Sequence, residues 1–255
     1  MTKEQKELYR LLAFFADFCD EHGLCYWLDG GTLLGAVRHQ GFIPWDDDID
    51  VGMPWEDYRK FLRLGDRLPD GFVIQSEETD PAYPFIFGKL CNTNIPFDRQ
   101  WNNGPKGIYI DIFPMVASRR KSRKNQWCFH LMQIIGYVLQ VKTGWDPMIP
   151  YKNRVARILF AVFALFPVPV LRWIRQRLIG CMRTERRGSV ACSLGTSRKA
   201  YQEFYPKAWF EDLTECRFGE ALFPVPSKWH EYLVSCYGEY MNLPPEEERR
   251  SYHKI

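Results

Sequence analysis

The chain has 255 residues, enough to bury a large core, and a formal net charge of +3 at pH 7. It contains no internal repeat or low-complexity tract, which excludes repeat arrays and fibrous proteins. Its eight cysteines form neither a C-x-x-C pair nor a zinc-type spacing with histidine, so we expect buried free thiols in a reducing compartment.

Residues 2–22 are predicted to form an amphipathic helix that supports the core. Thr2 and Gln5 have the spacing of a capping box, and Gly23 is a natural helix stop. One apolar stripe runs along this segment, made of Leu8, Leu11, Leu12, Phe15 and Cys19. The first residues are charged and carry no signal-peptide pattern, so we expect a cytoplasmic protein.

A strand is predicted over residues 24–28, which are apolar and aromatic. It ends at Gly30 and Gly31, and Thr32 follows. The next apolar residues recur at helical spacing, so a helix should begin near Gly31. The free N–H groups at such a helix start favour phosphate.

Four carboxylates then fall within five positions, at Asp46, Asp47, Asp48 and Asp50. In an extended strand Asp48 and Asp50 share one face, with Asp46 beside them, while Ile49 and Val51 face inward. Two like charges about 5 Å apart repel by roughly 3 kcal/mol at an effective dielectric of 20, so protonation, water or a divalent cation must compensate. Oxygen ligands suit Mg²⁺ or Mn²⁺. The alternative is a solvated acidic loop, against which the interleaved Ile49 and Val51 argue.

The elements that follow complete the prediction of an α/β fold. A helix is expected over 54–64, strands over 72–75 and 85–90, and a further strand around 108–112. Lys89 lies inside the second of these strands, where it either contacts a phosphate or carboxylate or reaches solvent at the sheet edge.

The charge balance divides the chain into three parts. Residues 1–116 carry 11 Lys and Arg against 19 Asp and Glu, residues 117–187 carry 15 against 2, and residues 188–255 carry 8 against 10. We predict a core in the first part, a basic, apolar helical insert in the second, and a C-terminal part that completes the domain with a strand or hairpin and a helix starting near Ser227. The apolar stretches of the insert are interrupted by polar residues and prolines, so neither is expected to span a membrane.

Three interpretations of the insert stay open. It lies on an anionic membrane face, holds a polyanionic or lipid-linked acceptor, or packs on the acidic half of the chain. Nucleic acid is not an expected partner, because no nucleic-acid motif accompanies the basic residues.

The run YWLDGGTLLGAVRHQGFIPWDDDIDVGM, residues 26–53, resembles the signature of the LicD family, which is related to fukutin and fukutin-related protein. It is also similar to the nucleotidyltransferase-superfamily pattern of a Gly-Gly-Ser/Thr turn, an Asp-x-Asp pair and a third carboxylate on a later strand. The stretch SKWHEYLVSCYGEYMNLPP resembles the LicD ending, so the similarity covers residues 8–253. It implies an α/β (α+β) fold with a nucleotidyltransferase-like mixed sheet flanked by helices.

The resemblance also implies the roles of individual residues. Gly30, Gly31 and Thr32 match the turn and would hold the donor phosphates. Asp48 and Asp50 match the acidic pair, and Asp111 in GIYIDIFPM is the best third carboxylate. These three are the implied catalytic and metal-binding residues for two Mg²⁺ or Mn²⁺ ions, and Asp111 would also accept the proton of the acceptor hydroxyl.

Other residues are expected to assist. Lys89 and Arg38 are candidates for the donor phosphates, although Arg38 and its neighbour His39 equally fit a solvent-facing role. Asp46 and Asp47 would support the metal ligands, and Asp29 would shape the turn. The role of His253 stays open. Four aromatic residues are either core or a cage for a quaternary ammonium group: Trp27, Trp45, Trp101 and Tyr109.

The resemblance implies a transferase that moves phosphocholine from CDP-choline to a glycan hydroxyl, as in the modification of lipopolysaccharide and other cell-surface glycans. The fukutin-related members of the family transfer ribitol phosphate from CDP-ribitol. Expected partners are therefore a CDP-linked alcohol and a glycan or lipid-linked glycan, with peripheral contact to the inner face of an anionic membrane. The alternatives are a nucleotidyltransferase that moves NMP from an NTP and a non-catalytic nucleotide-binding domain.

Overall fold

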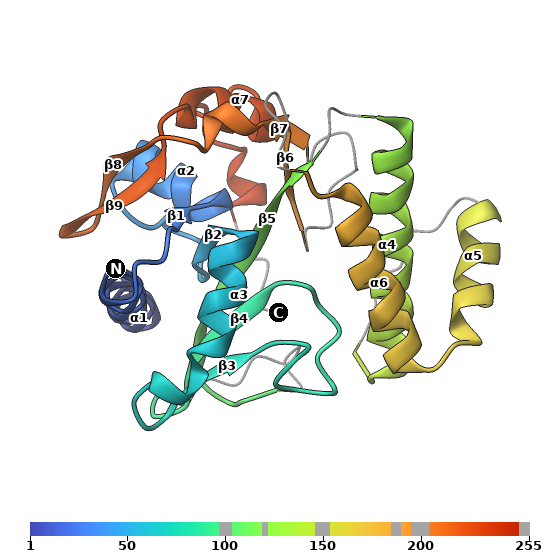
Figure 1. The fold of residues 1–255 in the computed structure, drawn as a ribbon. Helices are drawn as coiled ribbons and strands as arrows, with labels where there is room; N and C mark the ends of the chain where they lie inside the picture. The colour runs from blue at the N-terminus through green and yellow to red at the C-terminus, as the bar shows by residue number, and fades with distance from the viewer. Residues whose placement is uncertain (97–103, 119–121, 146–153, 185–189, 195–203, 250–255) are drawn as a thin grey trace.

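The longest strand, β5 (Ile108–Ser118), organises the sheet in the computed structural model, which describes residues 1–96, 104–118, 122–145, 154–184, 190–194 and 204–249 (Figure 1). Strand β2 (Asp50–Pro54) pairs with it in parallel, whereas β4 (Gly88–Asn92) and β6 (Val190–Ser193) pair antiparallel. The seven-stranded sheet is completed by β1 (Trp27–Leu28), β3 (Phe72–Gln75) and β7 (Phe204–Pro206). The predicted α/β fold with a mixed sheet is confirmed.

Three N-terminal helices flank this sheet: α1 (Lys3–Glu21), α2 (Gly30–His39) and α3 (Trp55–Arg63). The predicted capping box of α1 is present, because the Gln5 N–H donates to Thr2 Oγ1 at 3.1 Å and the Thr2 N–H donates to Gln5 Oε1 at 2.9 Å. The predicted apolar stripe of α1 is buried along its whole length. Short 3₁₀ turns follow at 65–67, 207–209 and 246–248.

The C-terminal part folds back onto these helices. The predicted hairpin is β8 (Leu213–Phe218) with β9 (Ala221–Pro226), and the predicted helix is α7 (Trp229–Tyr237). The Gly219 N–H donates to the carbonyl of Gln40 at 2.8 Å, and Phe218 stacks on Tyr9. Segments from the two ends of the chain therefore build one body.

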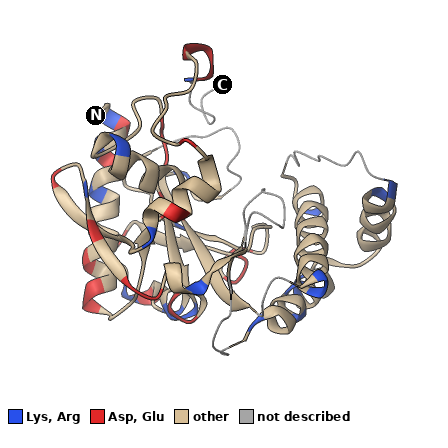
Figure 2. Cartoon of the chain, turned by 90° about the horizontal axis from the view of Figure 1, so that it is seen from above, with Lys and Arg blue, Asp and Glu red and all other residues tan. Residues whose placement is uncertain are grey.

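The described residues of the basic insert form three helices at one side of the sheet: α4 (Arg123–Lys142), α5 (Arg154–Ala164) and α6 (Val168–Met182) (Figure 2). They share a small apolar cluster that includes Ile135, Leu139 and Leu171. Buried Arg175 on α6 ties the insert to the core, since its guanidinium donates to Glu77 and to the Pro84 carbonyl. Within the described residues, no helix is long and apolar enough to cross a membrane.

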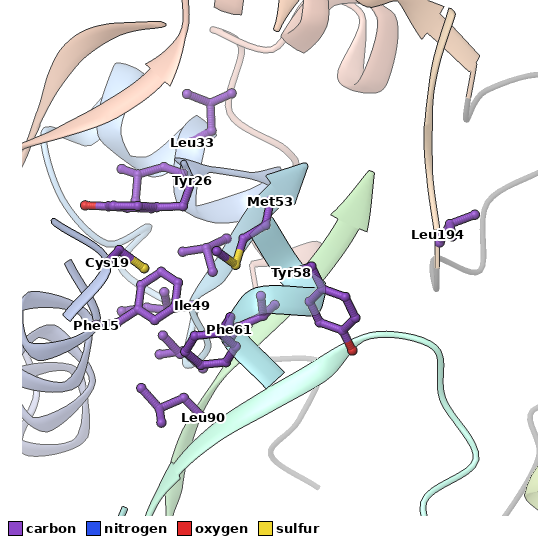
Figure 3. Packing of buried hydrophobic residues seen from close by; sticks show 14 of the residues in the cluster. Phe15, Cys19, Tyr26, Leu33, Ile49, Met53, Tyr58, Phe61, Leu90 and Leu194 are labelled. Atoms are coloured by element: carbon purple, nitrogen blue, oxygen red, sulfur yellow. The ribbon is translucent and has the colours of Figure 1, made fainter. Parts of the chain in front are cut away.

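The main core lies between α1, α3 and the sheet. Phe15, Ile49 and Phe61 point toward one another in Figure 3, and all three are fully buried. The Phe15 and Phe61 rings pack edge to face with centroids 5.6 Å apart. Each buried side chain of this size contributes about 1.5–3 kcal/mol relative to an exposed one, so this cluster fixes the strand that carries the acidic residues.

Some predicted boundaries are wrong. The strand expected over 85–90 begins at Gly88, because Phe85 and Phe87 pack their rings with Tyr83 instead of joining the ladder. The strand expected over 24–28 contains only its last two residues, and the acidic strand begins at Asp50.

All eight cysteines are free as expected, but Cys25 and Cys181 are exposed.

Candidate active site

The glycine turn lies directly against the acidic stretch. Helix α2 starts at Gly30, whose φ of +51° favours a residue without a side chain. A Cβ on Gly30 would stand 3.0 Å from Asp50 Oδ2, and one on Gly31 would stand 3.0 Å from Asp46 Oδ2. The first turn of α2 therefore meets two carboxylates at close range.

Strand pairing brings the distant Asp111 to the same place. Asp50 on β2 is in register with Asp111 on the neighbouring parallel strand β5, and the Asp111 N–H donates to the Ile49 carbonyl at 2.9 Å. Adjacent strands lie about 4.8 Å apart, so Asp50 and Asp111 are immediate neighbours across the sheet. On the other side of Asp111, strand β4 places Lys89 in register with it.

The carboxylates repel one another in a poorly solvated region. The pKa of Asp50 lies well above its usual value, first because the group is buried and then because of the charges of Asp48, Asp111, Asp29 and Asp46. The pKa of Asp46 is raised to about 8 by burial, by the charge of Asp48 and by a hydrogen bond with Asp48. Because the ionised forms are costly here, a bound cation would be favoured at this site.

Lys89 is the cation that faces Asp111 in the structure. Its Nζ lies 2.6 Å from Asp111 Oδ1 and 3.6 Å from the centroid of the Tyr109 ring, and Lys89 is only 6 % exposed. Burial acts to lower the pKa of Lys89, but the charges of Asp111 and Tyr109 and the hydrogen bond to Asp111 outweigh it, so the pKa is raised. Lys89 is thus buried against a partly buried carboxylate and does not reach solvent at the sheet edge.

The turn residues hold the backbone of Asp50 on both sides. The Asp50 N–H donates to Thr32 Oγ1 at 2.8 Å, and the Asp29 N–H donates to the Asp50 carbonyl at 3.1 Å. The hydroxyl of Tyr232 on α7 donates to Asp29 Oδ1 at 2.6 Å, and both residues are buried. These contacts fix the position of the Asp50 carboxylate relative to Gly30.

Two supports of the site were not predicted from the sequence. Gln5, expected only as a helix cap, also donates through Nε2 to the Asp46 carbonyl at 2.8 Å and thereby anchors the acidic stretch to α1. Tyr232 lies 203 residues from Asp29 in the chain. Its only sequence signal was its place inside the C-terminal stretch SKWHEYLVSCYGEYMNLPP.

Arg38 is not brought to the carboxylates. It lies in the last turn of α2, and its Nη1 donates to the Tyr240 carbonyl at 2.8 Å. Eight residues of helix separate it from Gly30, which is about 12 Å along the axis. The guanidinium therefore holds the C-terminal segment in this conformation, and His39 lies beside it within reach of its Nε.

The three aromatic residues of the proposed cage that the structure describes do not gather around one point. Trp27 is buried against Gly52 and Phe210, whereas the Tyr109 ring lies under Lys89. The ring of Trp45 lies 5.7 Å from the guanidinium of Arg249. Trp101 and His253 fall outside the described residues.

A comparison with protein families identifies the domain that contains these residues. Residues 23–137 match a sequence model of the LicD/FKTN/FKRP nucleotidyltransferase domain. These residues belong to the LicD family. The matched LicD domain contains the glycine turn, the four clustered aspartates, Lys89 and Asp111.

Similar proteins carry this domain in several organisms. The lipopolysaccharide cholinephosphotransferase LicD of Haemophilus influenzae is 26 % identical over 276 residues, which is 99 % of this chain and 96 % of that protein. The human ribitol 5-phosphate transferase FKRP is 60 % identical over 112 residues, 44 % of this chain and 21 % of that protein. The mouse ribitol-5-phosphate transferase FKTN is 28 % identical over 110 residues, 43 % of this chain and 21 % of that protein.

A groove of about 510 Å³ lies elsewhere, between α3 and α6. Trp55 and Trp173 line it together with Arg59 and Arg172. Trp55 follows the end of β2, four residues beyond Val51, so the groove and the Asp50 carboxylate lie at opposite ends of that strand. The residues that line this groove therefore do not include the clustered aspartates or Asp111.

Replacing Gly30 with Ala tests the close contact at the turn. The left-handed backbone costs an Ala about 1–2 kcal/mol, and the new Cβ would push against Asp50 Oδ2. Thermal denaturation should show this loss, and, on the function proposed below, Mg²⁺-dependent binding of a nucleotide donor should weaken. Gly136→Ala is the matched control, because a Cβ there meets nothing within 4 Å and should not destabilise α4. Unchanged melting and binding in Gly30→Ala would contradict the contact.

Proposed function

We propose that the chain is a metal-dependent transferase that moves a phospho-alcohol group, such as phosphocholine, from a CDP-activated donor to a glycan hydroxyl. The observation that carries the proposal is the register of Asp50 with Asp111 beside the first turn of α2. The helix start offers N–H groups to a phosphate, yet the adjacent carboxylates repel one. A divalent cation bound to the carboxylates would remove their repulsion of the phosphate. The relatives named for phosphocholine and ribitol-phosphate transfer support the reaction class.

The donor set fits a hard divalent cation. Asp48, Asp50 and Asp111 would supply carboxylate oxygens, which suit Mg²⁺ or Mn²⁺. Within the described residues, no group of three or more Asp, Glu, His or Cys side chains is arranged to hold a metal ion. Asp111 instead contacts Lys89. We infer that Asp111 exchanges Lys89 for the ions, of which we expect two. Bound there, such ions would neutralise charge on the transferred phosphoryl group and on the leaving CMP.

The remaining roles follow from position. The N–H groups at Gly30 and Gly31 would orient the donor phosphates, and Thr32 would hold the Asp50 backbone that faces them. Asp111 would accept the proton of the acceptor hydroxyl. Lys89, once released from Asp111, would contact a donor phosphate, while Asp46 and Asp47 would support the metal ligands. A donor-phosphate role for Arg38 remains a prediction that requires its release from the C-terminal segment.

A thermal-shift panel tests the proposal. It should contain CDP-choline, CDP-ribitol, CTP and other nucleotides, each with and without Mg²⁺, because the named relatives differ in head group. We expect stabilisation by a CDP-alcohol only when Mg²⁺ is present. At a ligand concentration 100-fold above Kd the expected stabilisation is about 2.7 kcal/mol. Equal stabilisation without metal would contradict the proposal.

Product analysis separates the alternatives. The proposed reaction releases CMP, whereas a nucleotidyltransferase that uses an NTP releases pyrophosphate. Metal and donor binding without turnover of any acceptor would favour a non-catalytic domain. A glycan or lipid-linked glycan as the acceptor is part of the proposal, and so is peripheral contact with an anionic membrane.

A further inference from the structure

Helix α5 carries an apolar stripe that faces away from the protein. Val155, Ile158 and Val162 are 53 %, 63 % and 45 % exposed, and Leu165 and Phe166 just beyond the helix are exposed as well. These residues repeat at helical spacing and form one face. The opposite face of α5 packs Phe160 and Phe163 against the small cluster of α4 and α6. The exposed stripe is therefore a second apolar face of a helix that is already packed.

The position of α5 leaves this stripe accessible. Figures 1 and 2 both place α5 at the outer end of the molecule, with α4 between it and the sheet. A contiguous exposed apolar face of this kind marks an interaction site.

The charge around the stripe identifies the partner. The described helices α4, α5 and α6 contain eight Lys and Arg and no Asp or Glu, and in Figure 2 they are tan with blue segments and no red ones. Exposed Arg154 and Arg157 lie on α5 itself, in its N-terminal part. Arg172 and Arg175 are engaged with Glu77 of the core, so they do not contribute to this surface.

We propose that the outer face of α5 docks on an anionic lipid surface. Its Val, Ile, Leu and Phe side chains would enter the acyl boundary, and Arg154 and Arg157 would meet lipid phosphates. The helix has 11 residues and spans about 16 Å, about half of the thickness of a bilayer core, so it lies in the plane of the interface. A second copy of this chain fits less well, because apposing two such faces would bring basic helices together.

The test uses the full chain and vesicles, with no donor or acceptor present, so its result does not depend on the transferase proposal. Co-sedimentation should show binding to vesicles of equal phosphatidylcholine and phosphatidylglycerol and little binding to pure phosphatidylcholine. The double variant Ile158→Glu/Val162→Glu should weaken binding on the order of ten-fold or more. Both positions are exposed, and circular dichroism should show an unchanged fold.

The matched control is Leu222→Glu/Val234→Glu, which adds the same charge at two exposed apolar positions on β9 and α7. It should bind vesicles as the unchanged protein does. Equal losses in both double variants, or no binding of the unchanged protein to anionic vesicles, would overturn the proposal. A dimer in light scattering that only Ile158→Glu/Val162→Glu dissociates would assign the face to a second copy instead.

Discussion

Asp50→Asn should abolish transfer and, in the absence of metal, make the protein more stable. The Asn side chain keeps the shape of Asp50 but removes a charge that is buried among other carboxylates. Relief of that repulsion should contribute about 1 kcal/mol or more, which raises Tm by roughly 2–4 °C in a protein of this size. On the proposed function, the loss of a carboxylate that would hold a divalent ion should reduce the rate to near background, a decrease on the order of 1,000-fold.

A substitution that raises the stability and lowers the activity identifies a residue of the site, whereas loss of a purely structural residue lowers both. Differential scanning calorimetry in chelator measures the first effect, and CMP release with Mg²⁺ measures the second. Asp66→Asn is the control, because Asp66 is exposed and lies outside the cluster. It should leave Tm and the rate unchanged. A destabilised Asp50→Asn protein with retained Mg²⁺-dependent turnover would refute the role of this carboxylate.

Lys89→Met should destabilise the metal-free protein strongly and make its stability depend on Mg²⁺. Met fills a similar volume but leaves Asp111 without the ammonium that lies 2.6 Å away. Removing one partner of a buried ion pair costs about 3–5 kcal/mol. If divalent ions bind at Asp111, they should restore part of this loss, so Mg²⁺ should raise the Tm of Lys89→Met more than that of the unchanged protein.

The control for Lys89 is Lys60→Met, which breaks a surface pair with Asp57 on α3. Its Tm should be unchanged, with or without Mg²⁺. Should Mg²⁺ fail to stabilise Lys89→Met, exchange of Lys89 for metal at Asp111 would be refuted.

Local signals in the sequence predicted the elements that depend on neighbouring residues. The capping box at Thr2 and Gln5 and the helix after Gly30 were predicted correctly, because each depends on residues within one or two turns. The alternation around Asp111 identified its strand. It did not identify the neighbours of that strand, because a parallel partner is 61 positions away and register is a tertiary property. Only the resemblance to the LicD family placed Asp111 with Asp50.

Long-range contacts account for what the sequence did not reveal. The lysine inside a strand left two alternatives open, a phosphate or carboxylate contact and a side chain that reaches solvent at the sheet edge; the pairing of β4 with β5 decided for Asp111. The sequence equally allowed Arg38 to contact a phosphate. In the structure, Arg38 instead donates to the Tyr240 carbonyl of the C-terminal segment. The contact of Tyr232 with Asp29 is also of long range.

The measurement that bears most directly on the site is anomalous diffraction from crystals of the full chain grown with Mn²⁺ and a cytidine diphosphate compound. The account predicts manganese within coordination distance of the side chains of Asp48, Asp50 and Asp111, with Lys89 moved away from Asp111 and the diphosphate at Gly30 and Gly31. A diphosphate bound without manganese at these aspartates, while Lys89 keeps its contact with Asp111, would contradict it.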